Sequence, residues 1–265
     1  MRTLTRKNTF HRITGLCLAI ACLQTLPLAG QDAASVANKP ERHLFILSGQ
    51  SNMTVGLTKG FTDAVENALG KENVTVAMSM KSGRGLRYWC SDYCYTNNQK
   101  PSEQERADNG SLYKPLIDAV KTAAGDKSFD RVTFIWMQGE SDAGKGRADV
   151  YAENFLKLLD RLKTDLKRDS MPFVLGRISD HNMTNPNWTS MREVQVKQAE
   201  SHADGAWIDT DDLNGGEAGV PGGELHYPKS DSVTLGERFA AKAIEMIRGA
   251  QDESASEKKV EKKAK

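Results

Sequence analysis

The sequence predicts a three-layer α/β fold with a parallel central sheet of about five strands. Three observations support this fold class. Short, nearly continuous apolar runs recur along the chain, amphipathic segments separate them, and polar loops rich in glycine and serine follow several of them. Continuous apolar strands alternating with helices are typical of a parallel sheet that is covered by helices on both faces.

The predicted elements follow one another in strand and helix order. The apolar runs of strand length lie at residues 43–47, 74–78, 131–137, 172–178 and 206–209. Apolar residues at spacings of three and four predict helices at residues 112–124, 150–166, 188–202 and 233–247. Residues 87–111 are polar and lack a clear periodicity, so we interpret them as an insertion over the carboxyl edge of the sheet.

The two ends of the chain differ from the predicted domain. Residues 1–30 contain four basic residues and no acidic residue, followed by an interrupted apolar run, which is typical of a secretory signal peptide. The run is too short for a membrane span and is interrupted by polar residues. We therefore expect a signal peptide (1–30), a linker (31–41), one folded domain (42–250) and a charged disordered tail (251–265), in a protein exported to the periplasm or the exterior.

The charge balance argues against a nucleic-acid partner. The chain has 36 Lys and Arg against 35 Asp and Glu, a formal charge of +1. Because all the charged residues of the predicted signal are basic, the remaining body is mildly acidic. A nucleic-acid binder has a basic excess instead. The hydrophobic content of 38% suits a globular domain. Nothing in the sequence indicates the oligomeric state.

Two of the four cysteines lie in the predicted domain, at Cys90 and Cys94. Since we expect an oxidising compartment, a disulfide that closes this short loop is the predicted state. Metal binding is the alternative, but the pair has no nearby histidine or second cysteine pair. We expect no metal and no cofactor.

Side chains that carry chemistry follow several of the predicted strands. Ser51 follows the first, Gly83 the second, and Gln138 and Glu140 the third, while His226 precedes the last helix. Ligands of parallel α/β sheets bind at the carboxyl ends of the strands. A serine, a histidine and an acid brought together there would support nucleophilic catalysis. Taken singly, each also fits a plain role: a capped turn, an ordinary turn, a helix cap or a structural histidine.

Four segments, in order, resemble the SGNH hydrolase superfamily, and more narrowly its branch of sialate O-acetylesterases and carbohydrate esterase family 6. The similar blocks are Gly49-Gln50-Ser51-Asn52-Met53, Ser82-Gly83-Arg84 through Trp89, Trp136-Met137-Gln138-Gly139-Glu140 and Leu225-His226-Tyr227-Pro228. Position 53 is methionine, so the first block is not the G-x-S-x-G elbow. The resemblance implies a flavodoxin-like SGNH hydrolase fold over most of the body.

The resemblance also implies residue roles. Ser51 is the expected nucleophile and His226 the expected base. The backbone N–H groups of Ser51 and Gly83 and the side chain of Gln138 are the expected oxyanion hole. The related enzymes remove acetyl groups from sugar hydroxyls by way of an acyl-enzyme, without a metal.

Two departures from the family pattern affect these assignments. The family usually has Asp three residues before the histidine, where this chain has Gly223. The acid we predict is therefore Glu140, with Glu224 second and the cluster Asp209, Asp211 and Asp212 third. Arg84 and Arg87 stand where Thr and Glu are common. We predict that these arginines and Gln50 bind substrate, which favours an anionic sugar, although surface solvation explains the arginines equally well.

These observations predict an exported serine esterase that removes O-acetyl groups from carbohydrate, of the sialate or polysaccharide acetylesterase type. The expected partner is acetylated carbohydrate. The alternative, motivated by Gly223, is a catalytically impaired carbohydrate-binding protein on the same fold. A lipid or thioester hydrolase would need an apolar acyl groove, which the sequence does not clearly contain.

Overall fold

A computed structural model describes residues 40–96, 98–215 and 223–264, with side chains described up to residue 252. The predicted signal peptide and residues 31–39 of the predicted linker lie outside the described residues. The strands are β1 (His43–Gly49), β2 (Val74–Met80), β3 (Arg131–Met137), β4 (Phe173–Gly176) and β5 (Gly205–Ile208). All neighbouring strands are parallel, in the order β2-β1-β3-β4-β5. This is the flavodoxin-like order, so the predicted fold class and strand segments are confirmed.

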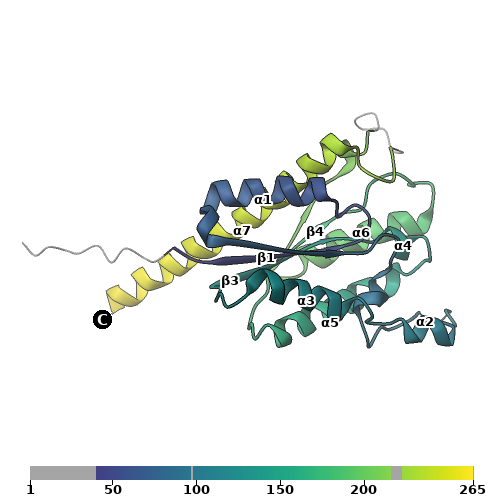
Figure 1. The fold of residues 1–265 in the computed structure, drawn as a ribbon, viewed down its shortest axis with the longest axis horizontal. Coiled ribbons are helices and arrows are strands. Elements are labelled where there is room, and N and C mark those ends of the chain that lie inside the picture. The colour runs from purple at the N-terminus through teal and green to yellow at the C-terminus, as the bar shows by residue number, and fades with distance from the viewer. Residues whose placement is uncertain (1–39, 97, 216–222, 265) are drawn as a thin grey trace, which may run out of the picture. The chain divides into compact units, whose positions relative to one another are not determined.

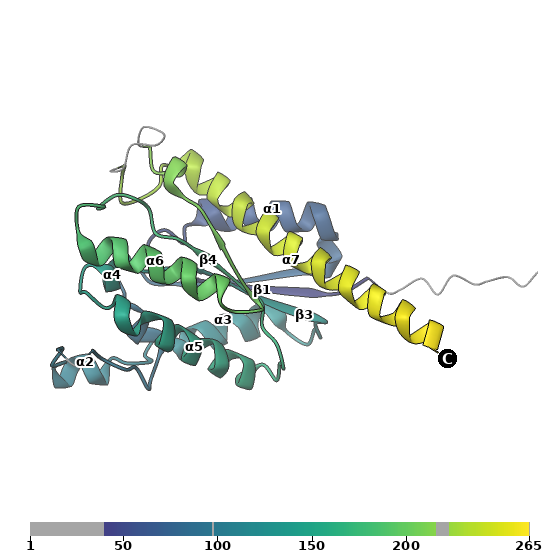
Figure 2. The same ribbon diagram turned by 180° about the vertical axis from the view of Figure 1, so that it is seen from behind.

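Helices cover both faces of the sheet, with α1 and α7 on one side and α3, α5 and α6 on the other (Figures 1 and 2). The helices are α1 (Val55–Leu69), α2 (Glu103–Ala107), α3 (Tyr113–Ala124), α4 (Glu140–Ala143), α5 (Ala148–Asp165), α6 (Pro186–Glu200) and α7 (Lys229–Ala264). Short 3-10 turns are η1 (Lys71–Asn73), η2 (Leu86–Trp89) and η3 (Asp211–Leu213).

Alternate residues of β1 supply two separate cores. Leu44 and Ile46 pack with residues of α3, α5 and α6. Phe45 and Leu47 pack with residues of α1 and α7. Because β1 is buried on both faces of the sheet, its apolar residues form a nearly continuous run and do not alternate with polar ones.

Helix α1 has no counterpart among the helical ranges predicted from the sequence. Its apolar pattern is interrupted by glycines, and glycine lowers helix propensity. The structure explains one of them: a Cβ at Gly60 would lie 2.2 Å from the Val233 oxygen in α7. Gly236 of α7 faces α1 in the same way, since a Cβ at this position would lie 2.0 Å from the Leu57 oxygen. These glycines allow the two helices to pack closely against each other.

The structure differs from the expected disordered tail, because α7 continues to Ala264. Residues 251–264 contain no glycine or proline and are rich in Glu, Lys and Ala, all of which favour helix. Within the described residues, no helix combines the length and apolar character that crossing a membrane requires.

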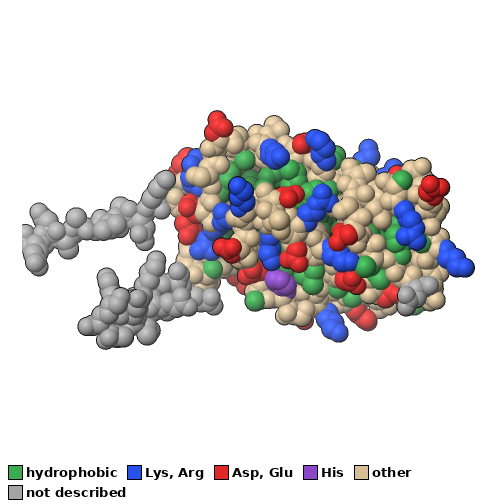
Figure 3. Space-filling view, turned by 90° about the horizontal axis from the view of Figure 1, so that it is seen from below, with side chains coloured by type: hydrophobic (Ala, Val, Ile, Leu, Met, Phe, Trp, Pro, Cys, Tyr) green, Lys and Arg blue, Asp and Glu red, His purple; other side chains and the backbone are tan. Residues whose placement is uncertain are grey.

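The insertion at residues 87–111 lies beside helix α5. The ring of Trp89 meets Trp136 of β3 edge-on, with ring centroids 5.1 Å apart. Asn154 of α5 accepts a hydrogen bond from the Cys94 nitrogen at 2.8 Å. Lys, Arg, Asp and Glu side chains are intermixed on the face seen in Figure 3, in keeping with the near balance of charge.

The register of the sheet brings three strand ends to one level. Gly49, the last residue of β1, is opposite Met80 of β2 and Met137 of β3. The loops that follow these strands carry Ser51, Gly83 and Gln138. Residues more than thirty positions apart in sequence therefore lie in loops at the same edge of the sheet.

Candidate active site

Ser51 lies in a tight connection between β1 and α1. The Gln50 nitrogen donates to the Met137 oxygen at 2.9 Å, and Thr54 caps the start of α1. Gly49 has φ 143°, and a Cβ there would lie 2.0 Å from the Met137 oxygen, so only glycine fits this position. The connection leaves Ser51 half-buried at the edge of the sheet.

His226 is the partner of Ser51. Its Nε2 atom lies 3.0 Å from the Ser51 Oγ, and the imidazole is exposed. The next residue, Tyr227, is buried and donates its hydroxyl to Thr210 Oγ1 at 2.8 Å, which anchors the loop just before α7. The structure thus brings the predicted nucleophile and base within hydrogen-bonding distance, as general-base activation of a serine requires.

The N–H groups of Ser51 and Gly83 are available to a ligand. Among the described residues, neither group donates a hydrogen bond to the protein. Gly83 is exposed, has φ 66°, and a Cβ there would have open space around it. N–H groups that have no protein acceptor and lie close to a nucleophile are the donors that an oxyanion needs.

Gln138 is fully buried and its amide nitrogen faces Asp142. The Nε2 atom donates to Asp142 Oδ2 at 2.7 Å, and lies 3.2 Å from Gln50 Oε1 and 3.4 Å from the Arg84 oxygen. Gln50 is also buried, and its Oε1 atom lies against the Gln138 amide nitrogen.

Asp142 connects two of the site's loops and was not among the predicted site residues. Its Oδ2 atom also accepts from the Leu86 nitrogen at 2.7 Å, so it ties the loop that carries Gly83 to the end of β3. Burial raises the pKa of this carboxyl. The signal available in the sequence was an acid four residues after Gln138, the spacing that places two side chains on the same face of a helix.

Glu140, the first-choice acid, lies at the start of α4 and contacts Asn52. Asn52 Nδ2 donates to Glu140 Oε1 at 2.8 Å and to the Leu225 oxygen at 3.1 Å. Burial raises the pKa of Glu140. In the part of the chain that the structure describes, no carboxylate forms a hydrogen bond or ion pair with His226.

The other acid candidates have different surroundings. The Glu224 side chain is exposed, and its backbone nitrogen donates to the Asn214 oxygen at 2.8 Å. The third-choice aspartates pair instead with arginines, in Arg177–Asp209, Arg177–Asp211, Arg192–Asp211 and Arg238–Asp212. A Cβ at Gly223 would lie 2.2 Å from Asn214 Oδ1, so the Asn214 side chain occupies the space that an aspartate at 223 would need.

The two arginines that were predicted to bind substrate have different environments. Arg84 is exposed, with its guanidinium 4.9 Å from the centre of the Tyr88 ring. Arg87 is only 2% exposed, donates to the Glu105 oxygen and pairs with Asp108. The structure therefore does not place Arg87 where a substrate could reach it, whereas Arg84 remains available.

The predicted disulfide is wrong, because Cys90 and Cys94 are free cysteines in the structure. The Cys90 thiol points into the core beside the Asn154 oxygen, and burial raises its pKa. The Cys94 sulfur faces a different residue of the same helix, α5, where Lys157 Nζ donates to it at 2.7 Å. The two sulfurs thus have separate partners.

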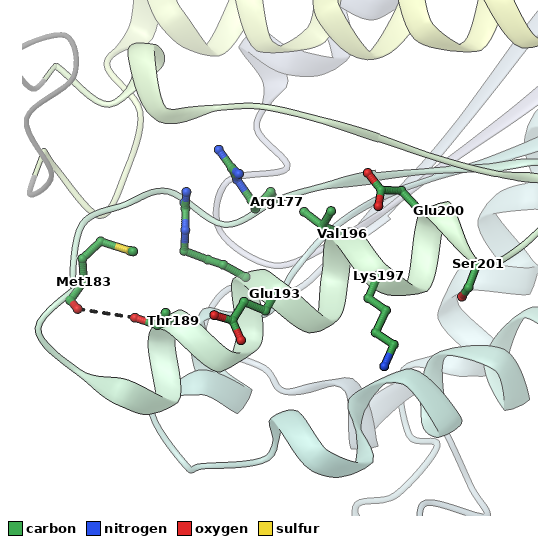
Figure 4. A pocket seen from close by; sticks show the side chains of 9 residues that line it. Arg177, Met183, Thr189, Glu193, Val196, Lys197, Glu200 and Ser201 are labelled. Atoms are coloured by element: carbon green, nitrogen blue, oxygen red, sulfur yellow. Dashed lines mark hydrogen bonds between the residues drawn. The ribbon is translucent and has the colours of Figure 1, made fainter.

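A cavity of about 610 Å³ lies along helix α6 (Figure 4). Its lining includes Arg177, Met183 and Lys197, but neither Ser51 nor His226. Thr189 Oγ1 and the Met183 oxygen, joined by a dashed line in Figure 4, are 3.4 Å apart. The Ser51–His226 pair is therefore separate from this cavity.

Residues 54–245 match the family model described as carbohydrate esterase, sialic acid-specific acetylesterase. The match covers more than half of the chain, begins just after the Ser51 loop, and includes Gln138, Glu140 and His226. None of the curated protein sequences compared with the chain matches it.

Several solved structures have a similar fold. An Arabidopsis thaliana protein has a TM-score of 0.57 at 17% identity, covering 78% of this chain and 99% of that protein. A carbohydrate acetylesterase from Xanthomonas citri has a TM-score of 0.58 at 16% identity, covering 78% of this chain and 57% of that one. The protein NanS has a TM-score of 0.58 at 12% identity, covering 80% and 99%. At these identities the similarity concerns the fold alone.

Proposed function

Because the chain belongs to the carbohydrate esterase family of sialic acid-specific acetylesterases, and is thus a carboxylic ester hydrolase, we propose that it removes O-acetyl groups from carbohydrate with Ser51 as nucleophile and His226 as base. The observation that carries this proposal is the 3.0 Å contact between Ser51 Oγ and His226 Nε2. The contact lies at the carboxyl edge of the sheet, the edge at which the loops after β1 and β2 carry the N–H groups of Ser51 and Gly83.

The proposed reaction has two halves. Ser51 Oγ attacks the acetyl carbonyl carbon while His226 Nε2 takes the hydroxyl proton. The negative charge that develops on the carbonyl oxygen is held by the N–H groups of Ser51 and Gly83. His226 then gives the proton to the departing sugar oxygen, which leaves an acetylated Ser51. A water molecule, deprotonated by His226, attacks this ester; the bond from the acyl carbon to Ser51 Oγ then breaks, His226 returns the proton to Oγ, and acetate is released.

Gln138 and an acid complete the proposed site. The longer contacts of the Gln138 amide, to Gln50 and Arg84, are the ones that a substrate oxyanion would replace. We assign the acid role to Glu140, ahead of Glu224, because Glu140 is buried close to the catalytic loops.

The substrate we propose is an acetylated sugar that carries a negative charge. The exposed Arg84 guanidinium, next to the Gly83 donor in sequence, supports this choice because a carboxylate binds guanidinium through charge-assisted hydrogen bonds. We also propose export, on the basis of the basic and apolar pattern of residues 1–30. The intact contact between Ser51 and His226 gives no support to the alternative of a catalytically impaired binding protein.

The test is acetate release from a panel of acetylated sugars, with and without a carboxylate. We expect turnover by the wild-type protein and a loss of about 10³-fold or more in kcat for Ser51→Ala and His226→Ala. Ser230→Ala is the matched control, since Ser230 is exposed, lies close to His226 in sequence, and donates its hydroxyl to Asp231 Oδ1 at 3.0 Å. Equal rates for Ser51→Ala and the wild type would overturn the proposal.

A further inference from the structure

We propose that Asn52 is a positioning residue that fixes His226 relative to Ser51 by holding the backbone of the histidine loop. This inference rests on the proposed function and adds a residue to its site. Asn52 directly follows Ser51 and is 1% exposed, so it belongs to the interior beneath the site rather than to the substrate surface.

The Asn52 amide nitrogen has two hydrogens and two acceptors. One acceptor is Glu140 Oε1 at 2.8 Å, and the other is the Leu225 oxygen at 3.1 Å. Leu225 directly precedes His226. One side chain attached next to the nucleophile is therefore bonded to the backbone next to the base, across 173 positions of sequence.

Glu140 determines which end of the amide faces the histidine loop. A carboxylate accepts hydrogen bonds, so Glu140 favours the orientation in which Nδ2, not Oδ1, points toward it. The same nitrogen then also faces the Leu225 oxygen. If the amide were flipped, Asn52 Oδ1 would face both Glu140 Oε1 and the Leu225 oxygen, and each contact would then pair two acceptors. Glu140 thus acts on His226 through Asn52, in agreement with the absence of a direct bond to the imidazole among the described residues.

The expected consequence concerns the rate of the chemical step. A general base must lie within hydrogen-bonding reach of the nucleophile, and a misplacement of about 1 Å costs roughly 10²-fold in rate. Because Asn52 is buried and does not face the substrate, its loss should lower kcat and leave KM nearly unchanged.

The main variant is Asn52→Asp, which keeps the shape of the side chain but removes both donors. It places an acceptor against Glu140 Oε1 and against the Leu225 oxygen, so we expect kcat on a small acetyl ester to fall by about 10²-fold with KM within about twofold. If Asn52→Asp does not fold, as judged by its thermal unfolding transition, Asn52→Ala is measured in its place.

Asn154→Asp is the matched control. Asn154 is also fully buried, and its Nδ2 atom also donates to two backbone oxygens, those of Cys94 and Val150, away from the candidate site. We expect a comparable loss of thermal stability but a kcat close to that of the wild type. An equal fall in kcat for both variants would mean general loosening of the fold, and would overturn the proposal.

A double-mutant cycle tests the route from Glu140. If Glu140 acts through Asn52, then Glu140→Ala should lower kcat little further once Asn52 is alanine. Additive losses would show that Glu140 acts on the site independently and would overturn this part of the inference. Ser51→Ala is included in every assay. An active Ser51→Ala variant refutes the proposed function, whereas an inactive one together with an Asn52→Asp variant of normal kcat refutes only the inference.

Discussion

Replacing Asp142 by alanine removes the carboxylate oxygen that accepts from both Gln138 Nε2 and the Leu86 nitrogen, each at 2.7 Å. The oxygen connects the end of β3 to the loop that carries Gly83. Without it, the Gln138 amide is free to turn over, and the loop loses an anchor close to its proposed oxyanion donor. The change therefore tests whether the two loops are held together as one binding unit.

The magnitude follows from the two bonds. A hydrogen bond to a charged group contributes about 1.5–3 kcal/mol to stability, so the pair contributes at most about 3–6 kcal/mol. Burial raises the pKa of Asp142, which shows that the ionised carboxylate itself is costly to bury and reduces this sum. We expect a net loss of about 2–4 kcal/mol in the free energy of unfolding. Misplacing one oxyanion donor should lower kcat by about 10²-fold.

The assay is hydrolysis of a small acetyl ester, measured with the free energy of unfolding by urea. Asp142→Asn is the matched variant, because its amide oxygen still accepts both hydrogen bonds, and it should retain most of the kcat. A folded Asp142→Ala protein with wild-type kcat would refute the reasoning, as would an Asp142→Asn protein as slow as Asp142→Ala.

Three further predictions concern stability and specificity. Burial raises the pKa of Glu140 above its ordinary value, so the folded state retains this proton to higher pH than the unfolded state, and stability is lost as pH rises through the folded pKa. The thermal unfolding temperature of Glu140→Gln, relative to that of the wild type, should therefore rise between pH 4 and pH 7. A fall in this difference over the same range would contradict the raised pKa. Gly236→Ala should cost about 1–3 kcal/mol by urea unfolding, since its Cβ would lie 2.0 Å from the Leu57 oxygen. Gly249→Ala should instead stabilise by up to about 1 kcal/mol, because among the described residues nothing lies within 4 Å of its Cβ. Equal effects of the two alanines would contradict the close contact of α1 with α7. Arg84→Gln should lower kcat/KM about 10-fold for acetylated sugars that carry a carboxylate and leave a neutral acetyl ester unaffected, while an equal loss on both would argue against an anionic substrate.

The strands, and which residues follow them, were predictable from the sequence because both depend on local patterns. The run at residues 131–137 has the same bounds in the structure as in the prediction. Ser51 and His226 were identified by their positions in polar loops after or between apolar segments. The parallel register then brings these loops together, which is a general property of the fold class.

Other features depend on contacts between distant segments. Helix α1 was missed because Gly60 breaks its pattern, and the reason for this glycine is a backbone in α7. The role of Arg87 was misjudged because its acceptors lie on the insertion, which has no periodicity to reveal its fold. The disulfide between Cys90 and Cys94 was expected from compartment and spacing, but the sulfurs face different neighbours.

The polar residues that support the site were also not predictable. Asn52 lies within the first motif block and Asp142 two residues after the third, yet only the folded structure shows their partners, Leu225 and Leu86, which are 173 and 56 positions away. A buried asparagine or aspartate has to be satisfied by whatever the fold brings near it. The sequence alone gives no indication of which backbone group that will be.

The most direct test of the central claim is to identify the residue that a serine-hydrolase probe labels. A fluorophosphonate forms a covalent bond to an activated serine, and peptide mass spectrometry locates the adduct. We predict an adduct on Ser51 in the wild-type protein and labelling slowed by at least about 10²-fold in His226→Ala. An adduct on another residue, or labelling of Ser51 that is unchanged without His226, would contradict the assignment of this pair as nucleophile and base.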